Sequence, residues 1–161
     1  KVGQVLLIDV DPEMLDQARG RLAAYGDRAK YSLGLFDDPL PNVTAFAASL
    51  SLHHISTLEA KAALFARMYE ALPPGGVFVN ADANMPREEI PRKRLYRKWA
   101  DHMVRSGIRE ERAWEHFEEW AEEDTYLPID EELSCLRSVG FEADRIWSEG
   151  PIGVVVATRP E

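Results

Sequence analysis

The sequence predicts an α/β fold with a doubly wound, mostly parallel sheet, a C-terminal antiparallel hairpin and a helical insertion. Three observations carry this prediction. Short apolar runs alternate with amphipathic helical segments over residues 5–79, an order typical of parallel sheets. Residues 86–125 then show helical periodicity without any strand pattern. The chain ends in two apolar runs joined by Gly150-Pro151, a connection too short for a parallel crossover.

The first β-α-β unit is predicted from its apolar runs and its capping residues. Residues 5–8 form a continuous apolar run, which predicts a strand buried on both faces. Asp11 is the expected N-cap of the following helix, with Pro12 at its first position and Gly26 at its end. Residues 31–36 predict the second strand.

The next elements repeat this alternation. A third strand is expected over residues 43–52, a helix over 57–72, and a fourth strand over 77–79 after Pro-Pro-Gly-Gly. A further helix is expected to begin at Asp130 and to end at Gly140, before the hairpin.

The insertion over residues 86–125 is predicted to contain two helices, separated by Ser106-Gly107, the first beginning at Pro91. We expect its aromatic residues to form mostly a core between these helices, with one or two lining a cavity. These aromatic residues are Tyr96, Trp99, Trp114, Phe117, Trp120 and Tyr126.

Length and net charge bear on the number of domains and on the class of partner. The chain has 161 residues, which suits a single domain, and a net charge of -9, which argues against a nucleic-acid partner. The basic run at 91–98 lies near an acidic run at 110–124, and we interpret both as solvated or mutually paired surface.

Cys135 is the only cysteine, which excludes an internal disulfide and fits a cytoplasmic location. No apolar run is long enough to cross a membrane.

Asp9 follows the first strand, at the edge where parallel sheets bind ligands. A carboxylate there can accept hydrogen bonds from both hydroxyls of a ribose. The alternative is an N-cap or a solvated loop acid, which this feature taken alone favours. Because Asp11 is the better-placed N-cap, Asp9 is left without a structural task, which strengthens the interpretation as a ribose ligand. Asp37 or Asp38, after the second strand, could accept from an adenine amine, although an Asx turn before proline explains them as well.

His53 and His54 follow the third strand at the same edge of the sheet. One of them could act as a general base. The alternative is that one packs in the core and the other caps the helix that begins near Ser56. We expect no metal site, because neighbours on an extended segment point in opposite directions and no cysteine or acid nearby supplies a third ligand.

Taken in order, these segments resemble the class I S-adenosylmethionine-dependent methyltransferases of the small-molecule type, which have a Rossmann-like fold. The resemblance covers nearly the whole chain and rests on LLIDVDPEMLDQAR, FDDPLP, SLSLHHI, LFARMYEALPPGGVFVNAD and GFEADRIWSEGPIGVVVATRP.

The resemblance implies a role for several residues. The family's ribose-binding acid falls on Asp9, and the position flanking the adenine falls on Val10. The strand end that faces the methionine part of the cofactor falls on Ser49, Leu50 and Ser51.

The chain departs from the family's pattern in two informative ways. The family's first strand and its glycine-rich loop are not among these residues, so we expect the chain to be the C-terminal portion of a longer methyltransferase. Gly34-Leu35 stands where the family often has Gly-Asp, so Asp37 or Asp38 would have to substitute for that acid.

The resemblance implies methyl transfer from S-adenosylmethionine to a small organic acceptor, with residues 86–125 covering the acceptor. Positioning supplies much of the rate in such a reaction, and His53 or His54 would be the base where the acceptor must lose a proton. The alternatives are an inactive scaffold or interaction module and, less favoured, a nicotinamide dinucleotide dehydrogenase. Assembly into a homo-oligomer is left open.

Overall fold

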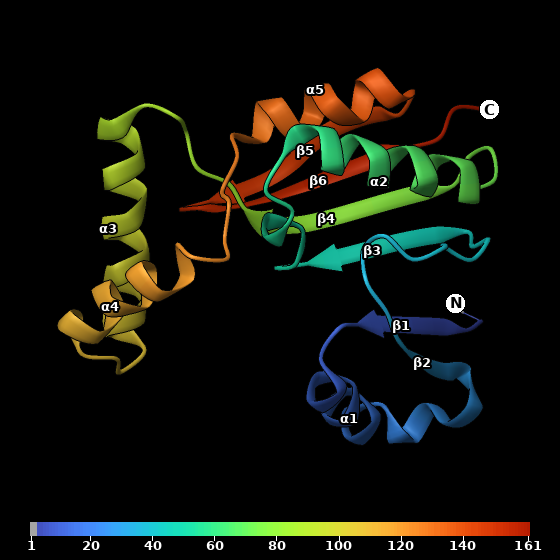
Figure 1. Cartoon of the computed structure of the whole chain (residues 1–161), viewed down its shortest axis with the longest axis horizontal. Helices are drawn as coiled ribbons and strands as arrows, with labels where there is room; N and C mark the ends of the chain where they lie inside the picture. The colour runs from blue at the N-terminus through green and yellow to red at the C-terminus, as the bar shows by residue number, and fades with distance from the viewer. Residues whose placement is uncertain (1–2) are drawn as a thin grey trace. The chain divides into compact units, whose positions relative to one another are not determined.

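The computed structural model describes residues 3–161 and divides into two compact units, residues 1–39 and 40–161. Figure 1 shows the elements of both units. The single domain expected from chain length stays a prediction. Within the described part of the chain, no helix has the length and apolar character to span a membrane.

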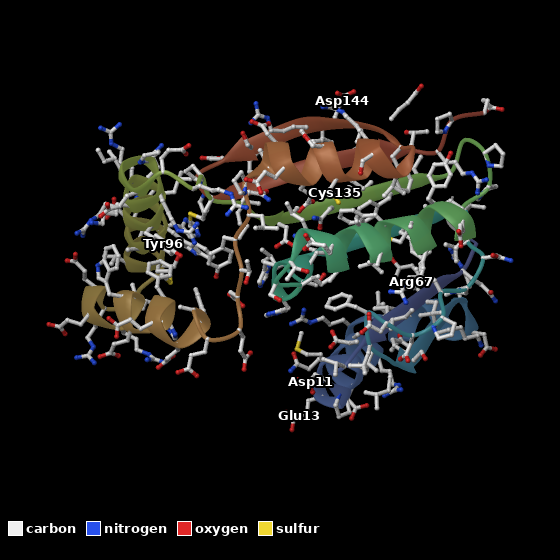
Figure 2. The ribbon with its side chains drawn as sticks, turned by 45° about the horizontal axis from the view of Figure 1, so that its top comes forward. Asp11, Glu13, Arg67, Tyr96, Cys135 and Asp144 are labelled. Atoms are coloured by element: carbon white, nitrogen blue, oxygen red, sulfur yellow. The ribbon has the colours of Figure 1, made fainter. Side chains whose placement is uncertain are left out.

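The first unit contains a two-stranded parallel sheet and one α-helix. Strand β1 (Val5–Asp9) pairs with β2 (Ala29–Leu33) in register from Val5 against Ala29 to Asp9 against Leu33. Helix α1 (Pro12–Arg21) begins as predicted, because the Asp11 side chain accepts a hydrogen bond from Glu13 N. Figure 2 shows Asp11 and Glu13 at this helix start.

Two details of the first unit differ from the prediction. Helix α1 ends at Arg21 and a 3₁₀ segment (Ala23–Arg28) follows, within which Gly26 has a φ of 55°. The expectation that β1 is buried on both faces is wrong for the described residues, because three of its apolar side chains are exposed. These are Val5, Leu6 and Ile8.

The second unit contains a four-stranded mixed sheet with the order β3-β4-β6-β5. Strand β3 (Ala45–Ser49) is parallel to β4 (Val77–Ala83), and β6 (Ile152–Thr158) lies antiparallel between β4 and β5 (Glu142–Glu149). The terminal hairpin is confirmed, with Gly150 and Pro151 between its two strands. The third strand is shorter than predicted and the fourth is longer.

Helices α2 (Leu58–Ala71) and α5 (Ile129–Val139) lie side by side on one face of this sheet (Figure 1). Thr57 caps α2 by accepting from Ala60 N, and α5 begins one residue before Asp130, with Pro128 as N-cap. Gly140 ends α5 in the left-handed conformation, as predicted. The side chains that α2 and α5 bury include Leu64, Phe65, Met68, Leu133 and Leu136, which form the main core with Phe78 and Val155 of the sheet.

The segment between β4 and α5 contains α3 (Glu89–Arg105) and α4 (Glu110–Trp120). Helix α3 begins two residues before Pro91, which therefore lies in the first turn, where its missing N–H costs nothing. The two helices share an aromatic core around Phe117, with Tyr96 and Trp99 edge-on to its ring. Figure 2 labels Tyr96 among these side chains. The prediction that these aromatic residues are mostly core is confirmed.

Candidate functional site

Asp9 ends β1 and lies at the carboxyl end of the two-stranded sheet. Its Oδ1 accepts a hydrogen bond from Asp11 N at 2.9 Å, which is an Asx turn. The inference that Asp9 has no structural task was therefore wrong, because Asp9 helps to set the chain for α1. Among the described residues no donor reaches its Oδ2, and Asp9 is half-buried, so one carboxylate oxygen remains able to accept from a ligand. The next residue, Val10, is exposed.

Asp37 and Asp38 lie in the turn after β2. Asp38 Oδ2 accepts from Leu35 N, three residues earlier, at 2.7 Å, so this acid closes the turn from its far end and does not form the predicted Asx turn. Gly34 suits this turn, because a Cβ there would lie 3.3 Å from Asp38 Oδ2 and 3.0 Å from Ile8 Cγ2. Both acids are exposed.

The residues after β3 have an unusual backbone. Leu50 has a φ of 48°, the only positive φ at a non-glycine position in the described part of the chain. Its N–H donates to Ala81 O at 2.9 Å, which holds the strained residue beside β4. Ser49 and Leu50 are exposed and Ser51 is half-buried. Strained residues of this kind concentrate at ligand sites.

His53 lies in a 3₁₀ turn (Leu52–His54) and is fixed by Asp82 at the end of β4. Asp82 Oδ2 accepts from His53 N at 3.0 Å, and Asp82 Oδ1 lies 2.6 Å from His53 Nδ1. Asp82 Oδ1 also accepts from Ala83 N at 2.8 Å. Because His53 Nδ1 is paired with this carboxylate, its other ring nitrogen, Nε2, is directed away from Asp82.

Asp124 joins the two histidines. Its Oδ1 lies 3.1 Å from His54 Nδ1 and 3.6 Å from His53 Nε2. Its Oδ2 accepts from the Tyr126 hydroxyl at 2.5 Å. Thr125 N donates to His53 O at 2.8 Å, which fixes the Asp124 segment against the 3₁₀ turn. Burial, and then the hydrogen bond to Asp124, raise the pKa of Tyr126 far above its usual range, so this hydroxyl stays a donor.

Two sequence inferences about the histidines need correction. The alternative to a catalytic role was that one histidine packs in the core and the other caps the next helix. His53 is indeed buried, but α2 is capped by Thr57 and by neither histidine. The reasoning against a metal was also wrong in its premises, because the two residues share a 3₁₀ turn and Asp124 supplies a nearby acid.

Sequence reasoning missed Asp82, Asp124 and Tyr126 as partners of the histidines. Asp82 had a usable signal, because it ends a strand adjacent to the one that precedes His53. Asp124 had none, because it ends an acidic run that is typical of solvated surface.

Residues 1–76 match the family model described as a methyltransferase domain. No curated protein matched the chain.

Solved structures with the same fold include human N-acetylserotonin methyltransferase in complex with S-adenosylmethionine (TM-score 0.63, 16% identity, 98% of this chain and 41% of that one). An O-methyltransferase family 2 protein from Planctomyces limnophilus, in complex with apigenin, gives a TM-score of 0.70 at 17% identity over 97% of this chain and 42% of that one. An O-methyltransferase family protein from Burkholderia thailandensis also gives a TM-score of 0.70, at 16% identity over 98% of this chain and 44% of that one. The chain spans about half or less of the length of these proteins.

Proposed function

We propose that this chain transfers a methyl group from S-adenosylmethionine to a small organic acceptor. Its residues 1–76 match the methyltransferase domain family, and the chain has the fold of class I S-adenosylmethionine-dependent methyltransferases. The observation that carries the proposal is Asp9, which ends β1 inside the matched region and has one carboxylate oxygen that no donor among the described residues reaches. That oxygen would accept from a ribose hydroxyl of the cofactor.

Other residues are assigned by their places in the fold. Val10, which is exposed beside Asp9, would flank the adenine, and Asp37 or Asp38 would accept from its amine.

Ser49, Leu50 and Ser51 would lie along the methionine part of the cofactor. The left-handed backbone of Leu50 supports this assignment, because strain at the end of a strand is typical of a ligand contact.

The histidines are the proposed acid–base groups. Where the acceptor is a hydroxyl or an amine, a base must take its proton, and His53 or His54 would do so. His54 is better placed to meet an acceptor, because its side chain is 46% exposed whereas that of His53 is 10% exposed. Helices α3 and α4 would cover the acceptor, and we infer a cytoplasmic enzyme from the single cysteine.

Calorimetry with S-adenosylhomocysteine on the natural full-length protein tests the cofactor assignment. We expect binding that Asp9→Asn weakens at least tenfold, because the amide keeps the Asx-turn acceptor but loses the charge and one acceptor oxygen. Asp16→Asn, on the exposed face of α1, is the control and should bind as the wild type does.

Absence of heat with both S-adenosylmethionine and S-adenosylhomocysteine would contradict the proposal and favour the alternative of an inactive scaffold. Binding that survives Asp9→Asn unchanged would remove Asp9 from the site. A screen of small metabolites with labelled cofactor would then identify the acceptor.

A further inference from the structure

Three side chains of the second unit bring potential metal-ligand atoms close together. One nitrogen each of His53 and His54 and one carboxylate oxygen of Asp124 all lie within 4.8 Å of one another. His53 and His54 come from the 3₁₀ turn after β3, and Asp124 comes from the segment that follows α4. The hydrogen bond from Thr125 N to His53 O connects these two segments directly.

The spacing of these atoms suits a tetrahedral ion. Zinc binds histidine nitrogen and carboxylate oxygen at about 2.0–2.2 Å, so two of its ligands lie roughly 3.3–3.5 Å apart. Asp124 Oδ1 lies 3.1 Å from His54 Nδ1 and 3.6 Å from His53 Nε2. Two of the three distances between ligand atoms are therefore close to those around zinc, and the third, between the two histidine nitrogens, is no more than 4.8 Å.

The outer hydrogen bonds also orient the ligands for a metal. His53 Nδ1 is paired with the buried Asp82, so Nε2 is the ring nitrogen that is left to bind a metal. Carboxylate–histidine–metal arrangements of this kind raise the basicity of the ligand and fix its ring. The Tyr126 hydroxyl holds Asp124 Oδ2, which turns Oδ1 toward the histidines.

The accessibility of the cluster leaves room for an exogenous ligand. The side chains of His53 and Asp124 are 10% and 8% exposed, but that of His54 is 46% exposed. A metal here would have two imidazoles and one carboxylate on its protein side and an open position toward solvent. Two nitrogen donors favour zinc or a similar transition ion over magnesium or calcium.

We propose that His53 Nε2, His54 Nδ1 and the Asp124 carboxylate form a binding site for a divalent transition metal of the zinc class, with one coordination position open. The site requires neither cofactor nor methyl transfer. In the loaded state both histidine lone pairs are occupied, so neither histidine could act as the base proposed above. The metal would instead lower the pKa of an acceptor hydroxyl bound at the open position.

Titration calorimetry with Zn²⁺, on protein first freed of metal by a chelator, tests the proposal in the absence of cofactor. We expect one ion per chain. His54→Ala and Asp124→Asn should each weaken binding at least tenfold, whereas His102→Ala, on the exposed side of α3, should bind as the wild type does. Co²⁺ should bind at the same site and give the intense visible absorption of a tetrahedral complex, which both ligand variants lose.

Asp82→Asn separates a metal site from a merely structural cluster. It keeps all three ligands and removes the outer carboxylate, so we expect binding about 10–100-fold weaker, measured where circular dichroism shows the variant to be folded. The Asp9→Asn variant should bind Zn²⁺ normally, so loss of cofactor binding and loss of metal binding are separate results.

Two results would overturn the proposal. One is the absence of a Zn²⁺ and a Co²⁺ complex at one ion per chain. The other is binding that His54→Ala and Asp124→Asn leave as strong as in His102→Ala, which would place the ion on some other surface group. In either case the contacts among these three side chains would be structural only.

Discussion

At the scale of single residues, Asp82 shows how one buried carboxylate organises a site. It accepts hydrogen bonds from His53 N and Ala83 N and is paired with His53 Nδ1, while its own side chain is almost fully buried. Its position therefore fixes both the backbone and the ring of His53.

Replacing Asp82 by asparagine should reduce the free energy of unfolding by about 2–3 kcal/mol. The amide NH₂ of asparagine would stand where a carboxylate oxygen now accepts from an N–H group, so two donors would face each other in a buried site. Urea denaturation measures this change. Asp144→Asn, in an exposed part of β5, is the control and should change stability by less than about 0.5 kcal/mol. Equal effects of the two variants would show that Asp82 does not hold the site together.

Residue patterns predicted the positions of candidate groups better than their partners. Asp9 and the two histidines were found because they follow strands, and strand ends meet at one edge of a sheet. Asp124 was missed because it lies 70 residues beyond His54, at the end of an insertion whose path no local pattern specifies. The sequence places two acids, Asp9 and Asp11, before the same helix, and in the structure each accepts a backbone hydrogen bond there. The prediction gave this role to Asp11 alone, so the Asx turn at Asp9 was missed.

At the scale of elements, α2, β4 and α5 are linked by a buried polar group. Lys61 Nζ lies 3.1 Å from Glu132 Oε2, and Asn80 Nδ2 donates to Glu132 Oε1 at 2.7 Å. All three residues are no more than 2% exposed. Lys61 stands on the apolar face of α2, where helical periodicity alone predicts only hydrophobic side chains.

Glu132→Gln should reduce the free energy of unfolding by about 3–5 kcal/mol, because it leaves the Lys61 ammonium buried without a counter-charge. The double variant Lys61→Met with Glu132→Leu should cost less than Glu132→Gln alone, since it removes both charges from the core. Urea denaturation of the two variants provides the comparison. A double variant less stable than Glu132→Gln would show instead that the ion pair stabilises the fold on balance.

Gly140 makes the junction between α5 and β5 sensitive to any side chain. Its φ is 119°, and a Cβ would lie 3.2 Å from the Tyr69 ring of α2. We expect Gly140→Ala to lower the free energy of unfolding by more than about 1 kcal/mol. Gly107→Ala is the matched control, because Gly107 also has a positive φ, of 96°, but has no atom within 4 Å of its Cβ position.

The difference between these two glycine variants measures the steric contact with Tyr69, and the thermal midpoint of each is a sufficient readout. If Gly107→Ala proved as costly as Gly140→Ala, the backbone conformation alone would account for both effects.

At the scale of the whole molecule, the two units differ in how much core they contain. In the first unit only Leu15 and Ala29 are buried apolar residues among those described. The second unit has an extended core between the four-stranded sheet and helices α2 and α5. A two-stranded sheet with so little buried surface is marginally stable in water.

Hydrogen exchange measured by mass spectrometry should therefore show weaker protection in β1 and β2 than in β4 and β6, because regions with few buried contacts open at a lower free energy. Under the proposed function, S-adenosylhomocysteine should increase protection in β1, where Asp9 lies, and the Asp9→Asn variant should lose that increase. Equal protection of β1 and β4 without ligand would contradict the prediction.

The fold class was predictable because it rests on the alternation of apolar runs and helices, which the sequence shows directly. The extent of burial was not predictable in the same way. The apolar run at residues 5–8 predicted a strand covered on both faces, but burial depends on which other segments pack against it, and the described residues leave three of its side chains exposed.

The position of β6 has a consequence for how the chain is made. Residues 84–151 separate this strand from β4, yet it lies inside the larger sheet and pairs along the second edge of β4, from Thr158 against Val77 to Ile152 against Ala83. During translation β4 therefore keeps an open edge while these intervening residues are added, and an open edge is a template for wrong pairing. The four-stranded sheet can close only once residues 152–158 have left the ribosome.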